Sequence, residues 1–281
     1  MIARRIMLSR RILAYSSQVL STEQRGDMVY WGKNRSSKTY YYYSGWTQAS
    51  YPNLEALFSM KYLVIACSIM KDELLLFQTK GIAFVFLEQS LHRTPEKMKP
   101  VIQDEINKAE QWDGDAIILG YGLCSNGALG IKAKRHPIVI PRVHDCIAMF
   151  LGSPERYMQE HRKEPGTYYL TKGWIGEGKS PLGVYEEYCR RYPKETAEWV
   201  IREELKNYTR IALVKTELGI SEAHREHALE NARFFNLKYE EIKGSLALFK
   251  KMLRGPWDKD FILLQPGEEA TQEMFLENEG Q

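Results

Sequence analysis

The chain has 281 residues, of which 44% are hydrophobic and 27% are charged, and its formal net charge is +3. This is the composition of an ordinary globular protein, and no apolar run approaches the roughly 20 residues of a membrane-spanning helix. Residues 1–59 hold eight Lys and Arg against three Asp and Glu, so residues 60–281 sum to −2. We therefore expect neither a membrane nor a nucleic acid as partner.

Residues 1–59 show no sustained hydrophobic period and are predicted to be an extension outside the core. The first 22 residues contain four Arg and no acid, which is typical of a transit peptide. Met60 immediately precedes the first strand pattern, and we favour a natural start there, with a misplaced start codon upstream. An ordered cap over the core is the third interpretation.

From Met60 on, short β-branched runs alternate with helical patterns. Strands are predicted at residues 61–66, 82–87, 115–119, 137–140, 167–171, 211–214 and 261–264. Helices are predicted near Met70, from Pro95 with Thr94 as cap, at 128–134, at 147–151, from Pro154 with Ser153 as cap, and at 184–192, 194–207, 222–235 and 246–253. The glycines around Trp174 predict an exposed loop.

This alternation predicts a three-layer α/β fold, with a mainly parallel sheet and helices on both faces. The domain would span residues 60–267, either as one body or as two related lobes. Residues 268–281 are an acidic tail that we expect to fray.

Three predicted strands deliver a cysteine near their carboxyl ends, namely Cys67, Cys124 and Cys146. Ligands of open parallel sheets bind where loops leave this edge, so the three thiols and the neighbouring His144 are expected to share a pocket. The alternative is that each is a small core residue. Cys189 lies in a charged helical pattern and is left out of the site.

Four widely spaced cysteines do not suggest a disulfide framework, so metal binding or thiol chemistry in a reducing compartment is expected. Cys67, Cys124, Cys146 and His144 form an ordinary zinc donor set. The three thiols could equally hold an iron–sulfur cluster with one iron left for a small-molecule substrate.

Four further residues are candidates for this site, each with an alternative. Asp145 would orient His144 or act as a general base, unless it caps the helix that follows. Arg142 would bind a carboxylate or phosphate of the substrate, unless it forms a salt bridge at the sheet edge. His92 and Gly122 are assigned to cofactor binding, although His92 could simply begin a solvated helix.

A cysteine nucleophile is the rival hypothesis. Cys124 lies between Gly122 and Gly127 ahead of the helix predicted at 128–134, whose N-terminus would favour a thiolate. With His144 as base and Cys146 or Cys67 as second thiol, a racemase-like or thiol-transfer mechanism would follow.

Several strings resemble the domain of unknown function 1638 family over about residues 61–266. They are Leu91-His92 ahead of Pro95, Tyr121-Gly-Leu-Cys124, Pro141-Arg-Val-His-Asp-Cys-Ile147, Leu151-Gly152, Gly166-Thr-Tyr-Tyr-Leu-Thr171 and Gly173-Trp-Ile175. The chain departs from the family pattern at residues 215–219, where a tighter turn is expected. The resemblance therefore assigns no role to that loop.

The resemblance implies a prokaryotic, cytoplasmic protein. Members of the family are often found beside corrinoid methyltransferase systems, so it also implies a link to one-carbon metabolism. The chain would then be an enzyme of methyl or thiol transfer or an accessory factor. A non-catalytic partner of a corrinoid protein or methyltransferase is the other possibility, with corrinoid bound only through that partner.

Overall fold

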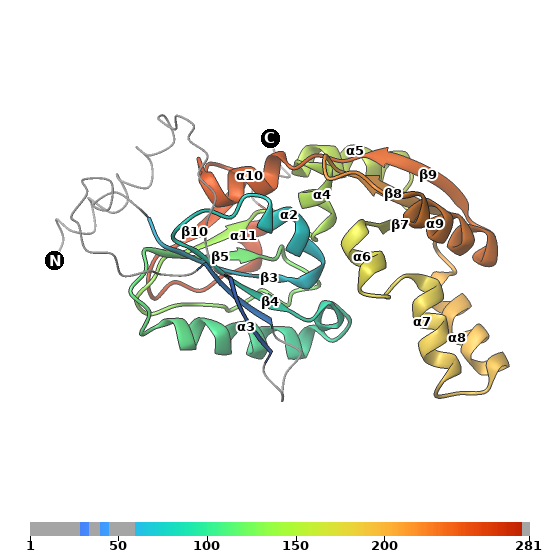
Figure 1. Cartoon of the computed structure of the whole chain (residues 1–281), viewed down its shortest axis with the longest axis horizontal. Helices are drawn as coiled ribbons and strands as arrows, with labels where there is room; N and C mark the ends of the chain where they lie inside the picture. The colour runs from blue at the N-terminus through green and yellow to red at the C-terminus, as the bar shows by residue number, and fades with distance from the viewer. Residues whose placement is uncertain (1–28, 34–39, 45–59, 277–281) are drawn as a thin grey trace. The chain divides into compact units, whose positions relative to one another are not determined.

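The computed structural model of the chain describes residues 29–33, 40–44 and 60–276 (Figure 1). The chain divides into two compact units, one of Met1–Cys146 with Phe249–Gln281 and the other of Ile147–Leu248. None of the described helices has both the length and the apolar character that a bilayer crossing requires.

A seven-stranded sheet in the order β1-β2-β4-β3-β5-β6-β10 organises the described part of the first unit. Its strands are β1 (Val29–Lys33), β2 (Tyr40–Ser44), β3 (Tyr62–Cys67), β4 (Ile82–Leu87), β5 (Ala116–Gly120), β6 (Ile138–Pro141) and β10 (Phe261–Leu264). The four strands from β3 to β6 are parallel, whereas β10 and the β1–β2 pair are added antiparallel.

The central strands are continuous runs of buried apolar residues because helices cover both faces of the sheet. In Figure 1, α3 (Pro95–Ala109) lies below this sheet, while α2 (Lys71–Leu75) and α10 (Ala247–Arg254) lie above it. The inner stripe of α3 is Met98, Ile102 and Ile106, four residues apart and fully buried. The predicted three-layer α/β fold is confirmed.

Two short 3-10 helices lie at the carboxyl edge, η3 (Ser68–Met70) after β3 and η4 (Gln89–Arg93) after β4. The order β4-β3-β5-β6 means that the chain leaves β3 in one direction along the sheet and continues from β5 in the other. The crevice at such a reversal is the usual ligand site of open α/β sheets. Here it lies between the carboxyl ends of β3 and β5.

The second unit has a three-stranded parallel sheet in the order β7-β8-β9. In chain order its elements are α4 (Ile147–Leu151), α5 (Pro154–Lys163), β7 (Thr167–Leu170), α6 (Lys172–Gly176), α7 (Pro181–Cys189), α8 (Lys194–Leu205), β8 (Arg210–Lys215), α9 (Glu222–Phe235) and β9 (Lys238–Lys243). Ser153 caps α5 as predicted, since its hydroxyl accepts from the Arg156 amide at 3.1 Å.

A buried arginine joins the amino ends of these three strands. Arg210 of β8 is only 2% exposed, and its guanidinium donates to the Thr167 hydroxyl of β7 at 2.8 and 2.9 Å. It also forms ion pairs with Glu240 of β9 and, at 3.6 Å, with Glu160 of α5. Because the charge is buried together with its partners, loss of one partner would leave an uncompensated charge.

The helix predicted at residues 128–134 does not form. Residues 124–130 are successive turns, and Gly130, inside the predicted helix, has a positive φ angle of 69°. The segment then pairs with the chain after β10, since the Gly130 amide donates to the Ala270 carbonyl at 2.8 Å. Helical dihedral angles are incompatible with both features.

Three other predictions are corrected. Residues 172–176 form α6 instead of a loop, because the Thr171 hydroxyl caps the helix by accepting from the Trp174 amide at 3.1 Å. β9 was not predicted, since four of its six residues are charged. The acidic tail is ordered up to residue 276, because α11 (Gln272–Leu276) buries Phe275. Residues 277–281 lie outside the described range.

Of the N-terminal extension, only β1 and β2 fall within the described residues. β2 pairs with the outer edge of β4 through Tyr40–Phe86, Tyr41–Val85 and Tyr42–Phe84. The pairing gives these residues a place at the edge of the sheet. The predicted start at Met60 stays a prediction.

Deleting residues 1–59 should leave a folded chain whose melting temperature changes by less than about 4 °C. The parallel strands β4, β3, β5 and β6 keep their pairing without β2, and only edge contacts are lost. Thermal unfolding of both chains measures the difference. A larger drop, or aggregation through the uncovered edge of β4, would show that the extension belongs to the fold.

Candidate functional site

The three cysteines of the predicted site lie on neighbouring parallel strands of the first unit. Cys67 is the last residue of β3, Cys124 lies four residues beyond β5, and Cys146 lies five residues beyond β6. β3 is paired with β5 up to Ala66–Gly120, and β5 with β6. Parallel pairing therefore brings all three cysteines to one edge of the sheet, at the reversal of strand order.

Two hydrogen bonds join the loop after β5 to the loop after β6. The Leu123 amide donates to the Val143 carbonyl and the Cys124 amide to the His144 carbonyl, each at 2.8 Å. Gly122 permits this approach, because a Cβ there would lie 2.4 Å from the Val143 oxygen. The close approach of the two loops therefore explains why glycine occupies position 122. The contact of Gly122 with a cofactor stays a prediction.

The backbone at Cys124 is held in a conformation that non-glycine residues rarely adopt. Cys124, Ser125 and Asn126 follow one another with φ angles of 46°, 55° and 69°. Each such residue costs free energy that the surrounding structure must offset, and such residues cluster at functional sites.

The thiols influence one another electrostatically and are strongly desolvated. Burial, together with Asp145 and Cys67, raises the pKa of Cys124 from 9.0 to about 12, although a backbone hydrogen bond at Gly122 opposes the shift. Burial, Asp145, Cys124 and Cys67 raise the pKa of Cys146 well above its ordinary value. Cys146 as a residue is half-buried. Without a cation, Cys124 and Cys146 therefore stay protonated at neutral pH.

A thiolate-binding cation would reverse this balance, because it favours the charged form of each thiol. Three thiols are a suitable donor set for zinc or for an iron–sulfur cluster. Within the described residues, however, no three His, Cys, Asp or Glu side chains are grouped closely enough to hold a metal ion. The donor types fit such a group, but the side chains would have to turn toward one another to bind it.

The loop after β6 also carries Arg142, His144 and Asp145, which differ in exposure and in their contacts. His144 is exposed, while its backbone carbonyl anchors Cys124. Asp145 is half-buried and raises the pKa of both neighbouring thiols. The Arg142 guanidinium donates to the Lys259 carbonyl at 2.9 Å and to the Met274 carbonyl, so it holds the C-terminal segment against β6.

His92 lies in η4, the 3-10 helix after β4. Its Nδ1 is 2.6 Å from the Gln89 carbonyl, and burial lowers its pKa while that hydrogen bond opposes the shift and Arg93 adds to it. The imidazole is therefore held in one orientation and neutral at pH 7. Neutral imidazole is the form that binds metals.

Sequence reasoning missed three polar side chains at this edge. Ser68, Gln89 and Tyr121 follow β3, β4 and β5, and each has a buried side-chain oxygen with no hydrogen-bond partner in the described protein. Tyr121 is only 3% exposed and lies close enough to all three cysteines for them to raise its pKa, after burial itself. Buried polar atoms normally have partners, so these oxygens mark places for atoms of a ligand or water.

The fourth cysteine is not part of the predicted site. Cys189 is the last residue of α7 in the second unit and is exposed. Its exclusion from the site stays a prediction, and Cys189 provides a natural control for experiments on the other three cysteines.

Tyr121→Phe should raise the free energy of unfolding of the metal-free protein by about 1 kcal/mol, because it removes an unpaired buried hydroxyl. Tyr188→Phe is the matched control: the Tyr188 hydroxyl donates to Glu204 at 2.5 Å, so its removal should lower stability. Urea unfolding measures both changes. A destabilised Tyr121→Phe would mean that this hydroxyl is already hydrogen-bonded.

Iodoacetamide at pH 8 should alkylate the exposed Cys189 well before Cys124 in metal-free protein. The thiolate is the reactive form, and a pKa of about 12 leaves almost none of Cys124 ionised at that pH. Peptide mass mapping over time measures the order. Alkylation of Cys124 at the rate of a free thiol would contradict the pKa and restore the nucleophile hypothesis.

Comparison with known proteins agrees with the motifs around this edge. A family model described as a protein of unknown function, DUF1638, matches residues 86–253, a range that includes Cys124, His144, Asp145 and Cys146. No curated protein matches the chain. Since the family model covers more than half of the sequence, this chain belongs to the DUF1638 family of proteins of unknown function.

Proposed function

We propose that this protein binds a zinc ion or an iron–sulfur cluster through Cys67, Cys124 and Cys146 and acts there on a small-molecule substrate. One observation carries the proposal: Cys67, Cys124 and Cys146 follow three adjacent parallel strands at the reversal of strand order, and Cys67 lies near enough to raise the pKa of the other two thiols. Closely spaced protonated thiols are what a soft-metal site becomes without its cation.

The remaining side chains have supporting roles in this proposal. His144, exposed beside the thiols, is the fourth ligand or stands at the open position. Asp145 would orient it or take a proton from the substrate. The bound metal would supply Lewis-acid activation of a thiol or water. The hydroxyl of Tyr121 would donate a hydrogen bond to the substrate or to a thiolate.

The wider role rests on the family resemblance. An association with corrinoid methyltransferase systems favours methyl-group metabolism in the cytoplasm, where thiols stay reduced. The chain would be an enzyme of methyl or thiol transfer, or an accessory factor that binds a corrinoid protein. Turnover with small thiols or methylated amines supports the enzyme, whereas co-purification with a corrinoid protein without turnover supports the accessory factor.

The structure disfavours Cys124 as the nucleophile of a metal-free enzyme. That hypothesis relied on a helix after Cys124 to stabilise the thiolate, and residues 124–130 form turns instead. Burial and Asp145 also raise the pKa of this thiol to about 12. A nucleophilic cysteine needs the opposite shift.

Elemental analysis and absorption spectroscopy of the anaerobically purified full chain test the proposal. Each of Cys67→Ala, Cys124→Ala and Cys146→Ala should lose most of the bound metal, and a double variant should lose little more, because the ligands act as a unit. Visible absorption would identify an iron–sulfur cluster, while zinc is colourless.

Cys189→Ser is the matched control and should keep the full metal content. Circular dichroism of each variant separates lost metal from lost fold. A wild-type protein without metal, or alanine variants that retain it, would refute the proposal.

A further inference from the structure

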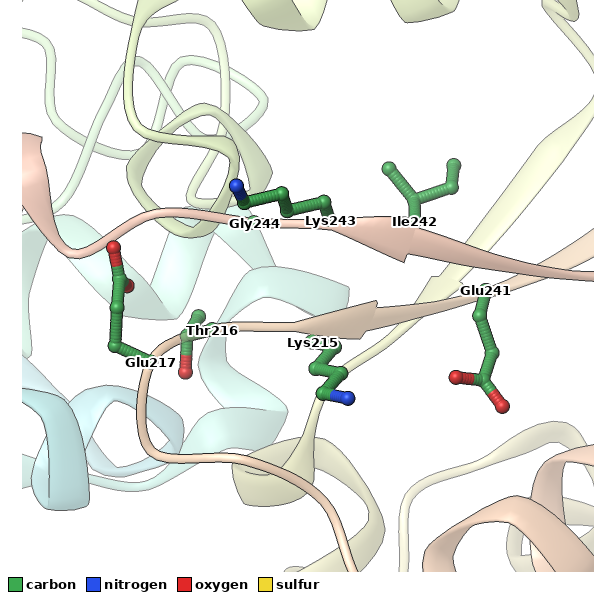
Figure 2. Close-up of a pocket in the computed structure, with 7 residues that line it drawn as sticks. All are labelled: Lys215, Thr216, Glu217, Glu241, Ile242, Lys243 and Gly244. Atoms are coloured by element: carbon green, nitrogen blue, oxygen red, sulfur yellow. The ribbon is translucent and has the colours of Figure 1, made fainter.

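The two parallel sheets differ in how the polar atoms at their carboxyl edges are satisfied. In the second unit, the carboxyl ends of β8 and β9 line a cavity of about 400 Å³ (Figure 2). Its two carboxylates already have donors, since Glu217 accepts from the Leu246 amide at 2.8 Å and Glu241 from Arg225 at 2.7 Å. No side chain that lines this cavity has a buried polar atom without a partner in the described structure. The edge of the first unit, by contrast, has the three unpaired oxygens.

One of these oxygens, the hydroxyl of Tyr121, lies near all three cysteines of the proposed metal site. The last register pair of β3 and β5 comes one residue before Cys67 and Tyr121 in the two chain segments. Burial raises the pKa of Tyr121 most, and Cys67, Cys124 and Cys146 raise it further, in that order. The phenolic oxygen is therefore close enough to each of the three sulfurs to be affected by its charge.

This hydroxyl has a hydrogen to donate and no acceptor among the described residues. Tyr121 is only 3% exposed, and its oxygen is buried without a partner, so bulk water does not satisfy it. The raised pKa keeps the hydroxyl protonated, so it can act as a donor. A buried hydrogen bond that is not made costs free energy, which a suitable acceptor would recover.

Metal binding would supply such an acceptor. Cysteine binds zinc or iron as the thiolate, a charged sulfur to which hydrogen bonds are stronger than to a neutral group. Two of the sulfurs already have backbone donors, since hydrogen bonds from Gly122 to Cys124 and from the Cys146 amide to its own sulfur favour their charged forms. The thiols must turn toward one another to bind a metal. The same rotation can bring one of them to the Tyr121 hydroxyl.

We infer that Tyr121 is a positioning residue of the metal centre, and that its hydroxyl donates a hydrogen bond to a metal-bound thiolate. The inference rests on the proposed function, because the acceptor requires a bound metal. It also decides between the thiolate and the substrate as the acceptor of this hydrogen bond. Donors to ligand atoms fix their orientation and tune the metal, so Tyr121 would adjust the Lewis acidity of zinc or the potential of a cluster.

Cobalt(II) titration of the metal-free full chain tests the inference, because thiolate ligands give cobalt a charge-transfer band in the near ultraviolet. Tyr121→Phe should weaken cobalt binding at least about tenfold, since it removes an unpaired hydroxyl from the free protein and a hydrogen bond from the metal-bound protein. The band should move to longer wavelength, because a thiolate without its hydrogen bond gives up an electron more easily. Tyr188→Phe is the matched control and should leave both the affinity and the band unchanged.

An iron–sulfur cluster offers a second measurement of the same hydrogen bond. If the chain is purified with a cluster, the reduction potential of that cluster should be more negative in Tyr121→Phe than in the wild type or in Tyr188→Phe. Hydrogen bonds to the sulfurs help to set this potential, and each stabilises the reduced, more negative state. Circular dichroism of each variant shows whether the fold is kept.

The outcomes separate this inference from the proposed function. Binding that is lost in Cys67→Ala, Cys124→Ala and Cys146→Ala supports the metal site itself. If Tyr121→Phe then binds cobalt as tightly as Tyr188→Phe does, or binds it less tightly without a shift of the band, the inference is wrong while the metal site stands. A wild-type chain that binds neither cobalt nor a cluster would overturn both.

Discussion

The parallel pairing of β3 with β4 on one side and β5 on the other is the constraint on which the first unit depends. It aligns the carboxyl ends of four strands and creates the reversal of strand order at their centre. Two amide–carbonyl hydrogen bonds then hold the Cys124 turn on the loop after β6. Backbone pairing therefore brings the three cysteines to one edge of the sheet.

The edge formed in this way is costly to the folded protein. The unpaired oxygens of Ser68, Gln89 and Tyr121 and three successive residues with positive φ all lower stability. Such features persist where the rest of the fold offsets them, and the fully buried sheet below them does so. Their concentration at one edge is the physical argument for a binding function there.

In the second unit, the charged residues at the two ends of the parallel sheet differ in burial and in pairing. At the amino ends, Arg210 is buried and its charge is matched by Glu160 and Glu240. At the carboxyl ends, Lys215 and Lys243 are exposed, and neither forms an ion pair with another described residue. Burial makes pairing obligatory at the first end, whereas water screens the exposed charges at the second.

The sequence by itself determined the strands β3 to β8 and most helices, because hydrophobic period, caps and β-branched runs are local signals. It also placed the cysteines at strand ends. Tertiary structure alone decided that residues 128–134 pair with the chain near Ala270, that the charged segment of β9 joins a sheet, and that Arg142 holds the C-terminal segment. These outcomes depend on contacts between residues far apart in the chain. Strand order, the shifted pKa of Cys124 and the unpaired Tyr121 hydroxyl follow from the same long-range packing, which no local pattern records.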